Sequence, residues 1–217
     1  MNKESILSAL KELREKNQKR NFSQTVDLIV ILKGLDLKKP EHKVDSFIVL
    51  PNQFGKKIKI CSLIDKELVQ QAKETFDKVI TKEQFPLLKK QEIKKLAREF
   101  DFFVAQANLM VEIAKYFGKS LGARGKMPNP KSGCVVPPNA NLKLLYEKLQ
   151  KTVRIQAKSE LAVKCQIGKE ALPDEELAAN VLAIYDNLIK ILPGEKTNIA
   201  KILLKFTMSS PIGVRDE

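Results

Sequence analysis

A basic, glycine-rich segment, residues 118–133, is the part of the chain best suited to contact phosphate. It holds four of the nine glycines and four cationic side chains, Lys119, Arg124, Lys126 and Lys131. Glycine lets the backbone approach a ligand closely, and adjacent N–H groups can bind an anion. The segment matches neither the Walker pattern nor G-x-G-x-x-G before a helix, so it does not predict a nucleotide site. We expect a phosphate contact or an interdomain latch, and an irregular basic loop is the simpler alternative.

A second candidate is the segment from Arg20 to Thr25, directly before a run typical of a strand. Phe22 lies here between cationic and hydroxyl side chains. This composition suits a base or ribose stacked on an aromatic ring, with the polar groups on phosphate or 2′-OH. The alternative is that Phe22 is a core residue at a helix–strand turn, and the pattern alone favours that alternative.

The third candidate is the run Thr207-Met208-Ser209-Ser210-Pro211, at the end of the last expected strand. Small hydroxyl side chains and a methionine can lie flat against a sugar edge, where a bulky charged side chain would not fit. An ordinary strand end is the alternative, and it is the simpler one.

Acidic residues and the single histidine form no catalytic pattern. No spacing among Glu15, Asp27 and Glu160 singles out a pair for acid–base chemistry. The acidic run at 174–176 suits the N-terminus of a helix. His42 lies in a polar loop, where we expect it to be solvated. The sequence therefore predicts that the protein is not an enzyme.

The composition narrows the function further. The chain has 217 residues, 39 Lys and Arg against 26 Asp and Glu, and a formal net charge of +13, which points to a polyanionic partner. One histidine and three scattered cysteines exclude a zinc finger and a histidine-built metal site, and no cofactor is expected. Cys61, Cys134 and Cys165 are expected to be buried thiols. Without a signal core or an apolar run of about 18 residues, we expect a soluble, cytosolic protein with no membrane partner.

The N-terminal and C-terminal parts of the chain, residues 1–57 and 153–217, are the two outer blocks. In both, the expected helices and strands follow one another without regular alternation. The expected elements are a helix over 4–17, a well-buried strand over 25–32, a strand over 46–50, a β-hairpin over 155–167, a helix over 173–191 and a strand over 199–207.

The middle block instead alternates strands with helices. The expected strands are 58–64, 78–80 and 102–105, and the expected helices are 65–76, 90–99, 108–117 and 141–151, with a long loop from 118 to 139. Such alternation is typical of a parallel sheet covered by helices. We predict a small Rossmann-like three-layer α/β domain.

The outer blocks have too few strands to fold separately, because a lone two-stranded sheet is marginal. We therefore predict an α+β discontinuous domain, residues 1–57 with 153–217, in which a split βαβ-like sheet packs with helices. It holds an inserted α/β domain, residues 58–152. The outer pieces carry net charges of +5 and zero, and the insert carries +8. Two connections between the domains predict a hinge.

Five segments, in order along nearly the whole chain, resemble the ribosomal protein L-one family of the large-subunit stalk. The most specific is Gly122-Ala-Arg-Gly-Lys-Met-Pro-Asn-Pro-Lys131, which is similar to the family signature G-P-R-G-L/K-M-P-N-P-K with Ala123 in place of proline. The others are Arg20–Asp27, Phe47–Pro51, Leu172–Asn180 and Lys205–Met208. Lys126 in the signature and the lack of an N-terminal extension are more similar to archaeal than to bacterial members.

The resemblance implies a two-domain fold that binds the stalk of large-subunit ribosomal RNA among other ribosomal components. It also implies that the protein assists release of deacylated tRNA from the exit site and represses translation by binding a similar structure on its own mRNA. The implied location is the cytoplasmic ribosome. We expect the free protein to be a monomer.

Carried over by motif, the RNA-binding candidates fall on the discontinuous domain. They are Arg20, Phe22, Thr25, Thr207, Met208 and Ser209, with Lys158 and Lys164 as flanking additions from the expected hairpin. Ser209 stands where the family has glycine, so its Cβ and hydroxyl are expected to shift or weaken that contact. The candidates of the signature loop are Gly122, Arg124, Gly125, Lys126, Met127, Pro128, Asn129 and Pro130. We predict that Phe22 and Met208 lie on neighbouring strand ends in one patch.

Two other functions stay open at this point. A nucleotide-dependent enzyme would use the α/β insert, and it would need a phosphate loop between a strand end and a helix start. A basic RNA-binding protein outside the ribosome would discriminate weakly between stalk RNA and random duplex at moderate salt.

Overall fold

The computed structural model describes residues 1–214 and divides into two compact units. The end unit combines both ends of the chain, Met1–Lys56 and Lys151–Glu217, and the insert unit is Lys57–Gln150. The divisions therefore lie one and two residues before the predicted ones at 57/58 and 152/153. Within residues 1–214, no helix combines the length and the apolar character needed to cross a membrane.

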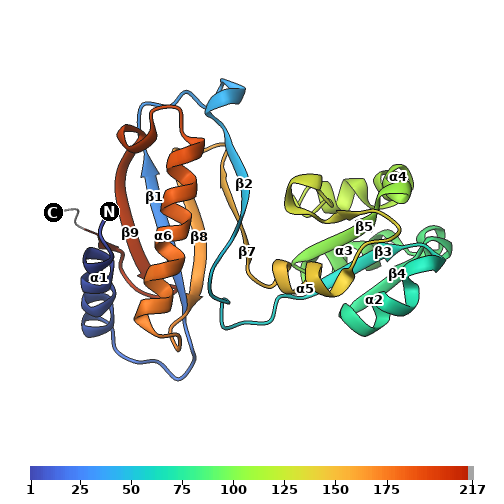
Figure 1. The fold of residues 1–217 in the computed structure, drawn as a ribbon, viewed down its shortest axis with the longest axis horizontal. Coiled ribbons are helices and arrows are strands. Elements are labelled where there is room, and N and C mark those ends of the chain that lie inside the picture. Colours follow the sequence, from blue (N-terminus) through green and yellow to red (C-terminus); the bar gives the residue numbers. More distant parts are fainter. Residues whose placement is uncertain (215–217) are drawn as a thin grey trace. The chain divides into compact units, whose positions relative to one another are not determined.

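A four-stranded antiparallel sheet organises the end unit, in the order β10-β9-β1-β8. Figure 1 shows β9, β1 and β8 side by side. The strands are β1 (Thr25–Leu32), β8 (Ala162–Lys169), β9 (Ile199–Phe206) and β10 (Ile212–Gly213). Helices α1 (Lys3–Lys16) and α6 (Asp174–Ile191) pack against the sheet and against each other. Their buried stripes include Ile6, Leu10 and Leu13 of α1 and Leu177, Val181, Ile184 and Leu188 of α6.

Strand β1 is buried on one face only, so the prediction of a well-buried strand was wrong in that respect. Val26, Leu28, Val30 and Leu32 are buried, whereas the residues that alternate with them are half-buried. The apolar residues of both faces make the run look continuous in the sequence. The helices cover one face, because successive strand residues point to opposite sides.

The predicted hairpin over 155–167 does not form. Strand β7 (Thr152–Ala157) pairs antiparallel with β2 (Val44–Val49) in a separate two-stranded sheet, and β8 pairs with β1. On the β2–β7 pair, the Asp45 carboxylate accepts hydrogen bonds from Arg154 Nε and Nη2, both at 2.9 Å. The hydrogen bond from Arg154 lowers the pKa of Asp45 to about 2. This long-range ion pair favours β2 as the partner of β7.

The insert unit is built on a parallel sheet in the order β4-β3-β5-β6. Its strands are β3 (Ile60–Ile64), β4 (Lys78–Thr81), β5 (Phe102–Gln106) and β6 (Val135–Val136), and its helices are α2 (Val69–Thr75), α3 (Lys90–Glu99), α4 (Met110–Gly122) and α5 (Leu142–Leu149). Helices α3 and α4 share one hydrophobic cluster with β3 and β5, and α2 packs against α5. Because crossovers between parallel strands are right-handed, connections that run in opposite directions along the sheet put their helices on opposite faces. The Rossmann-like three-layer arrangement of the insert stays a prediction consistent with this order.

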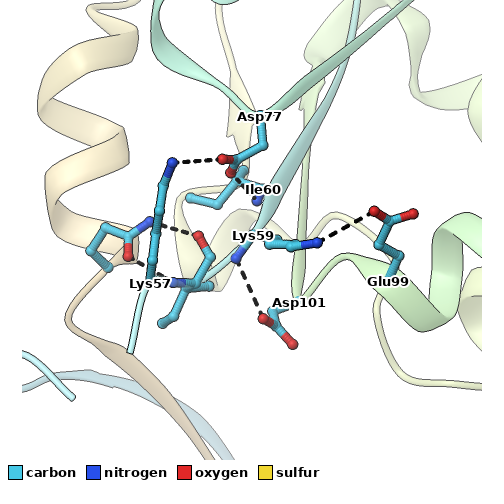
Figure 2. Close-up of polar contacts among 8 residues, drawn as sticks. Lys57, Lys59, Ile60, Asp77, Glu99 and Asp101 are labelled. Atoms are coloured by element: carbon cyan, nitrogen blue, oxygen red, sulfur yellow. Dashed lines mark hydrogen bonds and ion pairs between the residues drawn. The ribbon is translucent and has the colours of Figure 1, made fainter. Parts of the chain in front are cut away.

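A polar network links the two segments at which the chain enters and leaves the insert unit (Figure 2). Gln150, the last residue of the unit, accepts a hydrogen bond from Ile58 N at 2.9 Å and donates one to Ile58 O at 2.7 Å. Lys57 Nζ lies 2.8 Å from Asp77 Oδ1, and Asp77 also accepts from Ile60 N at 3.0 Å. Burial alone would raise the pKa of Asp77, but these hydrogen bonds lower it below its usual value. The network therefore fixes where the insert begins and ends.

The predicted loop from 118 to 139 is partly regular structure. Helix α4 continues to Gly122, because Phe117 and Leu121 are fully buried and keep its last turns packed on the core. Gly118 and Gly122 are therefore helical, and no atom lies within 4 Å of a Cβ built on either. Strand β6 also lies inside the predicted loop, where two residues are too short to recognise from alternation.

All three cysteines are buried as predicted. Burial raises the pKa of Cys61 and Cys165 to about 12 and that of Cys134 to about 11, so these thiols stay protonated. They act as small apolar side chains of the two cores.

Candidate nucleic-acid interface

The start of β1 and the end of β9 lie side by side, because the two strands are antiparallel and Val26 is opposite Phe206. Thr25 N donates to Thr207 Oγ1 at 3.3 Å, and Thr207 N donates to Thr25 O at 3.1 Å. Two candidate segments that are 182 residues apart in the sequence therefore meet at one sheet end.

Gln24 holds this junction together, and sequence reasoning missed it. Its side chain is only 3% exposed, and Oε1 accepts a hydrogen bond from Met208 N at 3.2 Å. Its backbone N–H donates to Glu170 Oε2 at 3.2 Å, and its carbonyl accepts from Glu170 N at 2.9 Å. The sequence shows only a glutamine two residues after Phe22. The burial of Gln24 and its hydrogen bonds depend on Met208 and Glu170, which are remote in the sequence.

Phe22 and Met208 are both exposed, with 53% and 59% of their surface accessible. The alternative that Phe22 is a core residue is therefore wrong. Phe22, Arg20 and Glu170 line a cleft of about 500 Å³. Arg14 also lines this cleft. Its Nε donates to Asp174 Oδ1 at 2.8 Å, and its two Nη atoms donate to the carbonyls of Glu170 and Leu172, so its guanidinium is held in place.

Ser209 closes the turn that presents Met208. Its Oγ accepts a hydrogen bond from Phe206 N at 2.8 Å, and Ser209 N donates to Phe206 O at 3.2 Å. The hydroxyl thus takes part in the backbone geometry of the turn. The expected effect of Ser209 on the RNA contact stays a prediction.

The flanking lysines lie in two different places. Lys164 is exposed on β8 and forms an ion pair with Glu160 at 2.6 Å. It lines a hollow of about 290 Å³ on the half-buried face of the sheet, together with Asp27 and Lys205. Lys158 instead pairs with Asp45 of β2 at 2.8 Å.

Asp27 places one carboxylate on this sheet face. Burial raises its pKa, and the neighbouring charges of Lys205 and Lys169 act in the opposite direction. A carboxylate repels phosphate but accepts hydrogen bonds from hydroxyl and amino groups. The face therefore combines a hydrogen-bond acceptor with cations, which suits a partner with both sugar hydroxyls and phosphates.

The signature loop is a fixed part of the insert unit. Lys126 Nζ donates to Phe100 O at 2.7 Å, and Met127 packs against the hydrophobic cluster under α3 and α4. Pro128 is buried, and the Asn129 side chain accepts from Lys131 N at 2.9 Å as Pro130 opens a short 3-10 helix. Gly125 has a positive φ of 65°, and Arg124 is exposed. These contacts account for Lys126, Met127, Pro128 and Asn129, while the predicted phosphate contact or interdomain latch stays a prediction.

The chain matches the model of the ribosomal protein L1p/L10e family over residues 13–210. It belongs to that family. It is 42% identical over 209 residues to a protein of Nanoarchaeum equitans, with 94% of this chain and 97% of the relative covered. It is 38% identical over 219 residues to one of Methanocaldococcus jannaschii, covering 100% and 98%, and 35% identical over 215 residues to one of Hyperthermus butylicus, covering 98% and 97%.

Each of these relatives is named large ribosomal subunit protein uL1. The family and its archaeal members confirm the resemblance that the five segments of the sequence indicated. They also confirm that the chain is a ribosomal protein of a non-enzymatic family. The matched range includes all of the RNA-binding candidates and the whole insert unit.

Proposed function

We propose that this protein is a structural component of the large ribosomal subunit that binds stalk ribosomal RNA through the end unit. The carrying observation is the junction of Thr25 with Thr207, which brings exposed Phe22 and Met208 to one end of the sheet in a member of a ribosomal protein family. We call Arg20, Phe22, Thr25, Thr207 and Met208 the composite patch.

The composite patch suits folded RNA for physical reasons. An exposed ring offers a stacking plane to a base, and a methionine offers a flat, adaptable apolar contact. Two threonines at neighbouring strand ends and a turn closed by Ser209 hold these groups in place, so little ordering remains to be done on binding. Cations such as Arg20 and Lys205 would position the phosphates around them.

The same patch is our proposed site for a stem of the protein's own mRNA, and movement of the bound stalk is our proposed aid to release of deacylated tRNA on cytoplasmic ribosomes. If one patch serves ribosomal RNA and mRNA, the two must compete for it. This gives a physical basis for repression, since free protein binds mRNA only when ribosomal RNA is saturated.

The test compares the affinity of the full chain for a stalk-like RNA and for an unrelated hairpin. Met208→Ala should weaken stalk binding by about 1–3 kcal/mol, in the range of a lost base contact, and leave hairpin binding unchanged. Lys164→Gln is the control, and it should lower both affinities alike and flatten their salt dependence. Equal losses on both RNAs for the two variants would contradict the composite patch and favour a general basic RNA-binding protein.

A further inference from the structure

The insert unit carries a cluster of exposed cations on the two helices that cover one face of its sheet. They are Lys94, Lys95 and Arg98 of α3, and Lys115 and Lys119 of α4. We call these five residues the α3/α4 basic face. Buried residues of both helices join one cluster, so the helices lie side by side. The five cations are on the sides of α3 and α4 that point away from that cluster, as the helical repeat requires.

Three carboxylates lie on the same two helices, and each has a partner other than the five cations. Glu99 pairs with Lys59 and Glu112 pairs with Lys82, while Glu92 accepts a hydrogen bond from Lys89 N. None of the five cations forms an ion pair with any residue between 1 and 214. Each carboxylate of α3 and α4 thus has a partner outside the five cations, and with six cations against three carboxylates the two helices keep a positive excess.

The face also works against helix stability. Lys94 and Arg98 are four residues apart on α3, and Lys115 and Lys119 are four residues apart on α4. Like charges at this spacing destabilise a helix. Lys95 is at helical spacing from Glu92 and Glu99, which offsets part of this repulsion, and a bound polyanion would relieve the rest.

The opposite side of the insert provides a contrast within the same unit. Helices α2 and α5 carry both signs, with Lys73 beside Glu74 and Lys143 four residues before Glu147. Helices α3 and α4 together carry six cations and three carboxylates, whereas α2 and α5 carry three and two, so the positive excess is larger on the α3/α4 side.

We propose that the α3/α4 basic face binds the sugar–phosphate backbone of an RNA helix without reading its sequence. This rests on the proposed function, since it adds a second RNA contact to a protein that already binds stalk RNA. The α3/α4 basic face consists of Lys and Arg side chains, which pair with phosphates. The neighbouring ring of Tyr116 has Lys115 Nζ at 5.6 Å from its centroid. Contacts to phosphate position a protein and carry no sequence information.

The test uses two double variants of the full chain with the same loss of charge. Lys94→Gln with Lys119→Gln changes one residue on each helix of the face, and Lys73→Gln with Lys143→Gln changes one on each opposite helix. The probes are a plain RNA duplex, the stalk-like RNA and poly-glutamate. Affinity is measured as a function of salt concentration, and circular dichroism checks that each variant keeps its helices.

We expect the first double variant to reduce the slope of log affinity against log salt by about two for the plain duplex. Each phosphate contact raises the affinity by a factor of about 8 for each tenfold fall in salt concentration. Taking 1 M salt as the reference at which these contacts contribute nothing, the loss of two contacts lowers the affinity at about 0.1 M salt by roughly 60-fold. The second double variant should bind as the parent chain does.

Equal losses for the two double variants would overturn the proposal, because bulk charge would then explain the binding. Loss of poly-glutamate binding with unchanged RNA binding would also overturn it in favour of an acidic protein partner. Failure of the composite patch has a different sign, since the parent chain would then bind the stalk-like RNA no better than an unrelated hairpin.

Discussion

Replacing Ser209 by alanine tests whether the turn before the C-terminus is held by a side-chain hydroxyl. Ser209 Oγ is the acceptor for the N–H of Phe206, whose side chain is buried at the end of β9. A hydrogen bond contributes about 0.5–1.5 kcal/mol net, and a donor left without a partner costs about 1–3 kcal/mol. Because this site is only partly buried, we expect Ser209→Ala to lower the free energy of unfolding by about 1–2 kcal/mol.

The matched control is Ser210→Ala, which removes a hydroxyl from the next residue. The Ser210 side chain is exposed, and only its backbone carbonyl takes part in a hydrogen bond among residues 1–214. Unfolding in urea should show no change for this variant. Ser209→Thr keeps the acceptor and should stay close to the parent protein.

Hydrogen exchange at the Phe206 amide gives the decisive measurement. In the parent protein this amide is protected by Ser209 Oγ, and in Ser209→Ala it should exchange faster while the amides of β1 keep their protection. Stalk RNA affinity should fall with it, by up to about tenfold for each 1.4 kcal/mol needed to order Met208 again. Unchanged exchange at Phe206, or equal effects from the Ser210 control, would refute the role of the hydroxyl.

Two further predictions concern stability. The hydrogen bond from Arg154 lowers the pKa of Asp45 to about 2. The contribution of this carboxylate to the free energy of unfolding is therefore complete above pH about 4 and is lost as the pH falls toward 2. Over that pH range, the urea midpoint of the parent should fall more steeply than that of Asp45→Asn. Gly133 has φ of 74°, so Gly133→Ala should cost about 1–2 kcal/mol, whereas Gly118→Ala inside α4 meets open space and should stabilise by about 0.5–1 kcal/mol; thermal melts compare the two.

Local periodicity predicted those elements whose burial is decided by their own residues. The strand over 25–32 and the helix over 90–99 have the same limits as β1 and α3. The apolar residues of the helix recur at helical spacing, and the strand is a β-branched apolar run between Gln24 and Lys33. The helix over 108–117 ended too early, because two glycines in α4 suggested a loop and the burial of Leu121 cannot be seen locally.

Pairing between distant segments was beyond the sequence. The alternation from 155 to 167 fits a hairpin as well as it fits two strands with other partners, and only the pairing of β7 with β2 and of β8 with β1 decides. The role of Gln24 depends on Met208 and Glu170, which lie at the other end of the chain. The α3/α4 basic face needed knowledge of which carboxylates are already engaged.

The composite patch exists only when the two ends of the chain are folded together, since Thr25 and Thr207 reach each other through the pairing of β1 with β9. RNA that binds this arrangement has no equivalent site on the unfolded chain. Binding must therefore stabilise the end unit, by about 2.7 kcal/mol when free RNA is at 100 times its Kd. Gln150 and Ile58 are hydrogen-bonded to each other at the two ends of the insert. Because the folded insert holds its own ends together, it adds little to the loop-closure entropy that the pairing of β1 with β9 costs. Under the proposed function, recognition of RNA and assembly of the discontinuous unit are therefore one equilibrium.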